Sequence, residues 1–289
     1  MASKKMLRAT LPAACLMFIG TLAACGAESG SVGENASSAE YAVTSDQPCL
    51  VGTRSIRIAQ RVTTSGSLAT NALSLESGTV ANGDANINNS STSQVRISGA
   101  TLNGNVQIAG AAPSVANGEL VNGGKITGTV TTGTATQSTL ASHAVTPGTT
   151  PVTVNSGAPA ATLAAGNYAA VQANGSKLTF ASGTFNLASL TVNSGAQIVF
   201  DTSTGPVSIN VQGTINFNGG TVSVVGTGLV TLYSNSTASN AVAINAGVGT
   251  VPATITAPNG GVVVGSRNTI VGCVGGKDLA FDPDSKQQQ

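Results

Sequence analysis

Short β-strand patterns follow one another closely along most of this chain, and this feature restricts its possible folds more than any other. From about Ile56 onward, apolar and polar residues alternate in runs such as 55–62, 94–98 and 207–211. Alternation of this kind is typical of strands that bury one face. Nearly every run ends at Gly, Asn or Ser-Gly, which favour tight turns. No helix-period pattern follows residue 24.

The same pattern predicts further strands at 105–108, 125–131, 177–180, 185–192, 197–200, 214–217, 221–225, 229–233, 242–245, 254–256, 262–264, 269–271 and 278–281. Sandwiches and barrels usually have longer strands and bulkier cores that include aromatic residues, but here aromatic residues are only 3%. We therefore expect an all-β fold, a right-handed parallel β-helix (β-solenoid), whose coils stack about 4.8 Å apart. Asn and Thr at its turns can form ladders between coils.

The N-terminal residues have the layout of an export signal. Lys4, Lys5 and Arg8 precede an apolar run at 11–22, which is shorter than the roughly 20 residues of a membrane-spanning helix. The small residues that follow also fit cleavage for plain secretion. The string Leu-Ala-Ala-Cys-Gly at 22–26, however, resembles the bacterial lipobox. This resemblance implies cleavage before Cys25 and lipidation of Cys25, including palmitate. Gly26 after the cysteine implies sorting to the outer membrane of a Gram-negative bacterium.

Changes in composition divide the chain into segments. We expect a signal peptide at 1–24, an acylated and disordered tether at 25–52, a β-solenoid at 53–285 and a disordered tail at 286–289. Within the solenoid, a first half at 53–133 and a second half at 162–285 flank an irregular, Pro-containing connector at 134–161.

Charge is scarce in this chain, at 8% of residues. Removal of 1–24 takes away Lys4, Lys5 and Arg8, which leaves nine basic and eleven acidic residues and a net charge of −2. Nucleic-acid binding requires a basic surface. The composition therefore argues against a nucleic-acid partner.

Two cysteines follow the lipidated one, Cys49 and Cys273. Export places them in an oxidising compartment, where thiols tend to pair. We expect a Cys49–Cys273 disulfide that joins the start of the folded part to its end region. The alternative is two buried free cysteines.

Short motifs recur in a fixed order along the folded body. They are Leu163 to Tyr168 (LAAGNY), Gly183 to Phe185 (GTF), Gly205 to Ile209 (GPVSI), Ala257 to Gly260 (APNG), Gly272 to Lys277 (GCVGGK) and Phe281-Asp282. This series resembles the "LxxGxY…GPVxI…APN…GK…YD" pattern of a β-helix domain family of uncharacterised bacterial surface proteins, over roughly Arg54 to Asp284. Phe281 replaces the usual Tyr, and Cys273 is unusual at its position. The resemblance implies a β-helical fold and a surface location but no activity.

We identify no catalytic residues, no metal site and no cofactor site. The carboxylates of the folded body are scattered at Glu76, Asp84, Glu119, Asp201, Asp278, Asp282 and Asp284. Asp282 and Asp284 are close together, but their position indicates a solvated terminus, and Ca²⁺ needs roughly six to eight oxygens. Calcium bound between coils stays open. His143 is predicted to be a surface loop residue, and Arg54, Arg57 and Arg61 are predicted to lie on a solvated strand face.

These observations favour a non-enzymatic outer-membrane or cell-surface lipoprotein. Its β-solenoid would act in adhesion, envelope structure or surface assembly. Its partners would be the membrane, through the N-terminal lipid, and a surface protein or polysaccharide. Exposed coil ends also favour self-assembly. The alternative is a carbohydrate-binding module or a carbohydrate-acting enzyme on the same fold, for which charged side chains gathered in one groove would be evidence.

Overall fold

The protein is a parallel β-solenoid of about 10 turns, as expected. The computed structural model describes residues 48–88, 95–109, 121–135 and 139–289. All regular secondary structure in these residues is β, arranged in sheets of 17, 7 and 4 strands. The expected signal peptide, Cys25 and most of the expected tether lie outside the described residues.

The strands of the first half are β1 (Leu50–Ile58), β2 (Thr63–Ser65), β3 (Leu68–Thr70), β4 (Leu73–Leu75), β5 (Val80–Asn82), β6 (Ala85–Ile87), β7 (Val95–Ser98), β8 (Thr101–Asn103), β9 (Val106–Ala109), β10 (Val121–Asn122), β11 (Lys125–Ile126) and β12 (Val130–Gly133). Those of the second half are β13 (Val152–Asn155), β14 (Ala161–Leu163), β15 (Gly166–Asn174), β16 (Lys177–Phe180), β17 (Gly183–Val192), β18 (Gln197–Asp201), β19 (Val207–Val211), β20 (Ile215–Phe217), β21 (Thr221–Val225), β22 (Val230–Ser234), β23 (Val242–Ile244), β24 (Thr250–Val251), β25 (Thr254–Val264), β26 (Thr269–Val271), β27 (Val274–Phe281) and β28 (Lys286–Gln288).

Each full coil has three strand segments, which we call its first, second and third faces. In one coil these are β3, β4 and β5. In the longer strands β1, β15, β17, β25 and β27, one strand supplies both the first and the second face. The first and second faces therefore form one bent sheet. The third-face strands form two separate sheets, which meet between β21 and β24.

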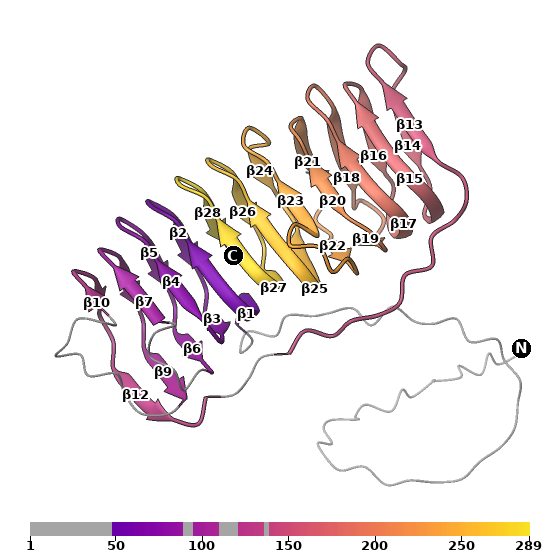
Figure 1. Cartoon of the computed structure of the whole chain (residues 1–289). Helices are drawn as coiled ribbons and strands as arrows, with labels where there is room; N and C mark the ends of the chain where they lie inside the picture. Colours follow the sequence, from indigo (N-terminus) through magenta and orange to yellow (C-terminus); the bar gives the residue numbers. More distant parts are fainter. Residues whose placement is uncertain (1–47, 89–94, 110–120, 136–138) are drawn as a thin grey trace, which may run out of the picture. The chain divides into compact units, whose positions relative to one another are not determined.

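The order of the coils in space differs from their order in the sequence. The first strand, β1, lies in the middle of the solenoid, between β3 and β4 on one side and β27 on the other. From β1 the chain coils outward to β12 at one end, and the second half then starts at the other end with β13 and coils back to β27 (Figure 1). The two halves thus meet at β1 and β27, and the solenoid is a circular permutation of a simple stack.

The connector has to return from one end of the solenoid to the other. Gln107 Nε2 donates to the carbonyl of Thr134 (2.7 Å), and the amide of Gly148 donates to the carbonyl of Tyr168 (3.1 Å). Ten first-face segments, from β9 to β15, lie between β12 and Gly148–Thr150. Residues 139–151 contain no helix or strand, and Leu140 and His143 contact the first-face strands β27 and β22. This part of the connector therefore runs along the first face.

The connector is shorter than expected. Val152–Asn155, which the composition placed in the connector, is strand β13, and strand β14 (Ala161–Leu163) starts at the last residue of the predicted connector. The irregular part of this segment ends near Pro151. Its prolines and threonines suit an extended chain, but those after Thr150 lie at or between strands of the end coil.

The core consists of the inward-facing side chains of all three faces. In β19, Val207, Ile209 and Val211 are buried and alternate with partly exposed residues. Phe180 packs against Phe185 and Phe200, with ring centroids 5.1 and 5.7 Å apart. Coil lengths range from 17 residues (Leu68 to Ala85) to 27 residues (Ile215 to Val242). The extra residues of the longer coils form loops at the corners. The inward-facing residues of neighbouring coils therefore stay in register.

Asparagine ladders join successive coils of the second half, as the turn composition predicted. At the end of the second face, amide-to-carbonyl hydrogen bonds of 2.7–3.1 Å link Asn155, Asn174, Asn193, Asn218 and Asn245. A second ladder on the first face links Asn167, Asn186 and Asn210. The first ladder thus satisfies side-chain polar groups at a corner across five coils, and the second does so within the first-face strands of three coils.

Two predicted boundaries were wrong. The tail expected at 286–289 contains β28, which pairs with β26 and β2. The expected tether included Cys49 to Gly52, but Cys49 is buried and β1 starts at Leu50. Both errors have one cause. The first and last coils bury each other's edges, and neither segment shows this partner in its own sequence.

Candidate functional site: the seam between the first and last coils

The seam is the contact between β1 and β27 together with the turns attached to these strands. Here two coils touch that are far apart along the chain, in a parallel ladder from Leu50–Val274 to Ile58–Phe281. Everywhere else the peptide chain itself determines which coil follows which. At the seam, side chains have to specify the partner and its register, because a slip by one residue would turn the inward face outward.

The Cys49–Cys273 disulfide closes the seam, as predicted. The two Cα atoms are 4.6 Å apart and the residues are 224 positions apart in sequence. Both cysteines directly precede the first-face part of their strand, Leu50 in β1 and Val274 in β27, so they occupy equivalent positions of neighbouring coils. The amide of Val274 also donates to the carbonyl of Cys49 at 2.8 Å.

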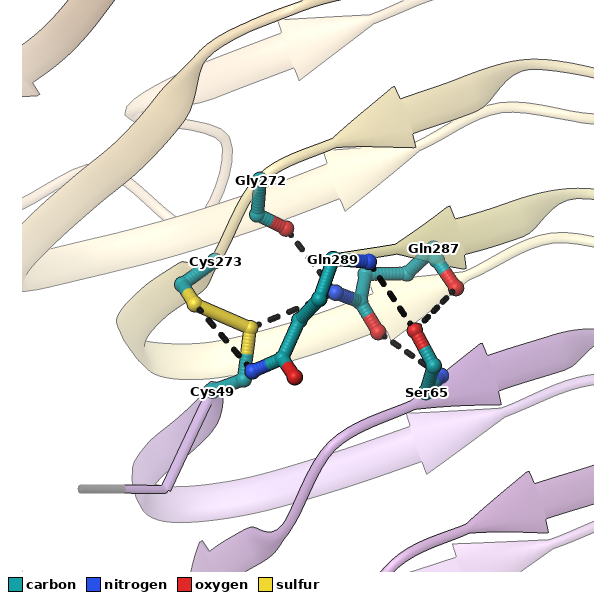
Figure 2. The surroundings of a disulfide bond; sticks show 6 residues. All are labelled: Cys49, Ser65, Gly272, Cys273, Gln287 and Gln289. Atoms are coloured by element: carbon teal, nitrogen blue, oxygen red, sulfur yellow. Dashed lines mark hydrogen bonds between the residues drawn. A yellow bond between two sulfur atoms is a disulfide. The ribbon is translucent and has the colours of Figure 1, made fainter. Parts of the chain in front are cut away.

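Two glutamines of the last coil tie the disulfide to the first coil (Figure 2). Gln287 is fully buried, and its Nε2 donates to the carbonyl of Gly272 (2.9 Å) and lies 3.3 Å from Cys49 Sγ. Gln287 Oε1 accepts from the amide of Ser65 (3.0 Å), and the amide of Gln289 donates to Ser65 Oγ (3.0 Å). The buried Gln287 side chain both donates through its amide nitrogen and accepts through its amide oxygen. A shift in register would leave these buried groups without partners, so they help to specify the register of this contact.

Two bidentate ion pairs cross the seam. Arg54 donates to both carboxylate oxygens of Asp278, with Nε 2.6 Å from Oδ1, and Ser55 Oγ adds a hydrogen bond of 2.6 Å. Arg61 donates to Asp284 through Nε (2.7 Å) and the second guanidinium nitrogen (2.9 Å). A third pair, Arg57–Glu76 (3.0 Å), joins β1 to the next coil. Such forked contacts add geometric specificity even where exposure limits their energy.

The corner between the second and third faces has an unusual composition at the seam. Three residues after the last inward residue of the second face, other coils carry a left-handed glycine, for example Gly78, Gly195 and Gly247. Three neighbouring coils instead carry Arg267 (φ 63°), Asp284 (φ 63°) and Arg61 (φ 56°). A left-handed conformation costs an ordinary L-residue roughly 1–2 kcal/mol. In this column, Arg267–Asp284–Arg61, charged side chains occupy positions where glycine would be less strained. The strain is accepted at the place where the two halves meet.

The seam also changes the acidity of its carboxyl groups. Partial burial alone would raise the pKa of Asp278, but hydrogen bonds from Arg54 and Ser55 and the charges of Arg54 and Lys277 bring that pKa below its usual value. The hydrogen bond from Arg61 lowers the pKa of Asp284, with further help from the charges of Arg61 and Arg267. Both carboxylates are thus held in the charged form that the ion pairs require.

The prediction for the three arginines was incomplete. Arg54, Arg57 and Arg61 do lie at exposed positions, with side-chain exposures of 60–64%, but each one forms an ion pair. Asp284 is not a free terminal carboxylate, because it pairs with Arg61. For Arg61 and Asp284 the sequence signal was present, since these two residues stand where other coils have glycine. That correspondence is readable only once the coil register is known.

The other carboxylates remain apart. Asp84 accepts the amide of Asn105 (2.7 Å), and Asp201 binds the amide and hydroxyl of Ser203. Within the described ranges there is no group of three or more His, Cys, Asp and Glu side chains able to hold a metal ion. Glu119 lies outside the described residues. A shallow hollow of about 200 Å³ beside the seam is lined by Gln60, Ser74, Glu76, Ser77, Arg96 and Ser98.

His143 lies on the surface, as predicted, but it contacts the solenoid. Its ring stacks on Tyr233 of β22 with centroids 3.8 Å apart. The Tyr233 hydroxyl accepts from the His143 amide (2.9 Å) and donates to the His143 carbonyl (3.1 Å). Leu140 covers Gly275 of β27, where an added Cβ would lie 2.9 Å from Leu140 Cδ2. The connector thus crosses the second half against specific side chains.

The part of the chain that the structure describes has no helix long and apolar enough to span a membrane. Residues 160–250 match the model of a domain of unknown function (DUF7305). This match is consistent with an uncharacterised family, and it ends before β25 and the seam. Comparisons with curated proteins and with solved structures gave no match.

Proposed function

We propose that this protein is a non-enzymatic, lipid-anchored scaffold of the bacterial envelope. In this proposal Cys25 carries the lipid, the segment before β1 is the tether, and the anchor is in the outer membrane. The β-solenoid presents its faces to a surface protein or polysaccharide and acts in adhesion, envelope structure or surface assembly.

The position of β1 is the observation that carries this proposal. The tether would join the solenoid at its middle, where β1 and β27 meet, and not at an end coil. Both end coils and the second and third faces would then stay clear of the attachment point. A rigid body held at its middle suits display of long surfaces.

The disulfide supports export of the folded body. Disulfides persist in oxidising compartments and are rare in reducing ones. Cys49 is buried and its bond to Cys273 closes the seam. A chain that depends on this bond for closure would fold best outside the cytoplasm.

The anchor is tested with wild-type protein and a Cys25→Ser variant in the same Gram-negative host. Labelling with a palmitate analogue should mark the wild type alone, and the wild type should fractionate with the outer membrane. Attachment of cells to surfaces and their resistance to detergent should change only with the anchored protein. An equal effect from the released Cys25→Ser protein would overturn the scaffold role, because an enzyme or soluble binding protein does not need the anchor.

The hollow beside the seam favours a test of the carbohydrate alternative. Its lining offers serine hydroxyls, Gln60, Glu76 and Arg96. A glycan array with the Cys25→Ser protein should give no binding if the protein is only a scaffold. Sugar binding that an Arg96→Ala substitution abolishes would favour the carbohydrate-binding module.

A further inference from the structure

Both end coils carry strand edges that a second copy of the chain could pair with. At one end the outermost strands are β12, β10 and β11, and at the other they are β13 and β14. All coils progress in the same direction, so the two ends have matching strand polarity. Exposed edges of this kind are templates for pairing between molecules. Something must decide whether copies stack into a filament.

Protection by charge is sparse at these edges. Natural edge strands are often blunted by charged side chains, especially Lys, or by Pro. Lys125 in β11 is the one charged residue of the outermost strands, and no Lys, Arg, Asp or Glu occurs from Ile126 to Ser176, which includes β12, β13 and β14. Pro151 and Pro159 flank β13 and β14 but lie within neither strand. Side-chain charge would therefore oppose stacking on the third face alone, at Lys125, and would not prevent pairing of the first and second faces.

The ends do not fit each other, because the first face is one segment longer than the other two. At the β13 end, Gly148–Thr150 of the connector lie along β15, with hydrogen bonds from Gly148 N to Tyr168 O (3.1 Å) and from Ala169 N to Thr150 O (2.9 Å). At the other end, β12 extends the first face beyond β10 and β11. Both extra segments lie on the same face.

Head-to-tail stacking would therefore bring β12 of one copy against Gly148–Thr150 of the next. If these two segments paired, the second and third faces would be held one strand spacing too far apart, by about 4.8 Å. Rotating the next copy by one face does not help. The first and second faces form one bent sheet whereas the third is separate, so the cross-section has no threefold symmetry.

We infer that the extra first-face segment is a built-in stop that keeps the solenoid from polymerising head to tail. The two extra first-face segments lie at the two ends of the connector. β12 directly precedes the connector, and Gly148–Thr150 are its last residues before β13. The same segment that allows the permuted topology thus also limits assembly. This inference goes beyond the scaffold role, and its failure would leave that role standing.

A deletion of residues 130–133 tests the stop in the full chain carrying Cys25→Ser. It removes β12 and leaves the connector long enough for a span that is one coil shorter. The parent protein should run as a single chain in light scattering after size exclusion, over a wide range of concentrations. The deletion variant should form multiples of the chain mass that grow with concentration, and filaments in negative-stain electron microscopy.

Folding of the variant is checked by its β-type circular dichroism and by the mass of a peptide that contains the Cys49–Cys273 disulfide. If the deletion does not fold, replacement of residues 130–133 by Gly-Ser-Gly-Gly tests the same point by weakening β12 without adding a proline, and Thr131→Val is the control that keeps β12. A folded deletion or replacement variant that stays a single chain would overturn the stop. Head-to-tail filaments of the parent protein would overturn it equally.

Discussion

At the scale of single residues, charge is the feature that this protein uses most selectively. Every ion pair within the described ranges includes Arg54, Arg57 or Arg61, all in β1 or the turn after it. Exposed ion pairs contribute little stability on average. They can still discriminate between partners, because a wrong register would leave like charges together or separate the pairs. We therefore attribute to them the choice of register at the seam.

The lowered pKa values of Asp278 and Asp284 predict acid sensitivity of the seam. Because the folded-state pKa lies below that of an unfolded aspartate, about 3.9, the stabilisation is present above that pH. It is lost as the pH falls through the folded-state pKa. The melting temperature of the protein should therefore decline below about pH 4, most clearly at low salt.

A double variant, Asp278→Asn with Asp284→Asn, provides the comparison for this prediction. It should melt at a lower temperature than wild type at pH 7, and its melting temperature should fall less on acidification. The parallel substitution Asp84→Asn is the control, because the Asp84 carboxylate forms none of the ion pairs of the seam and accepts the backbone amide of Asn105. Identical acid profiles for wild type and the double variant would exclude a role for these carboxylates.

At the scale of elements, the connector is the most consequential segment. Its residues 139–151 run along the first face, where they contact Tyr233 and Gly275. Burial of Tyr233 raises the pKa of its hydroxyl, which is protonated and able to donate at neutral pH even at the usual value of about 10. Its two hydrogen bonds involve the backbone of His143 and would form with any residue there.

Tyr233→Phe should loosen the connector without unfolding the solenoid. The substitution removes the hydroxyl but keeps the ring that stacks on His143. Loss of both hydrogen bonds, at about 0.5–1.5 kcal/mol each, corresponds to a roughly five- to 160-fold faster cut within 139–150 during limited proteolysis. Tyr168→Phe is the matched control, since the Tyr168 hydroxyl donates only to Ala164 within its own coil (2.8 Å). Equal cleavage of the two variants would argue against the latch.

At the scale of the whole molecule, permutation changes what holds the body together. The coil that contains β27 and β28 lies next to the coil that contains β1 and β2. No short stretch of chain joins these two neighbouring coils. By register, Gln289 and Cys49 stand where Gly66 and Ser67 link β2 to β3 in the next coil. The disulfide and the ion pairs therefore hold these two coils together, as a two-residue turn does between other coils.

A circular permutant tests this view. It starts at Thr139, joins Gln289 directly to Cys49 and ends at Ala135. It should fold to the same solenoid, because the new link matches those between other coils. Reduction of the disulfide should lower the free energy of unfolding of the natural order by about 2–4 kcal/mol. The loss should be smaller in the permutant, because a peptide link already closes the seam.

Denaturant midpoints with and without reductant provide the measurement, and hydrogen exchange at β1 and β27 locates the effect. The natural order should lose protection at these two strands first after reduction. An equal loss on reduction in both chain orders would show that the disulfide acts through something other than closure of the seam.

Much of the local structure was predictable. Strands such as β19, β21 and β26 coincide with runs of alternating residues, because one buried face requires a period of two. The two strands predicted at 254–256 and 262–264 are instead the two ends of one strand, β25. The strands β2 to β6 were missed, since three-residue strands rich in Ala, Thr and Asn hardly differ from turns. The disulfide was predictable because the export-signal pattern predicts an oxidising compartment, and the two cysteines after Cys25 leave one pairing.

The sequence by itself therefore determined the strand period, the small-residue turns, the asparagine ladders and the pairing of Cys49 with Cys273. These depend on neighbours in the chain or on composition. Only the tertiary structure decided the order of the coils, the partners of Arg54 and Arg61, and the path of the connector. Each of these depends on the pairing of β1 with β27, a strand about 224 residues away. The inward faces of similar coils are nearly interchangeable. A local sequence pattern therefore does not specify which coil stacks on which.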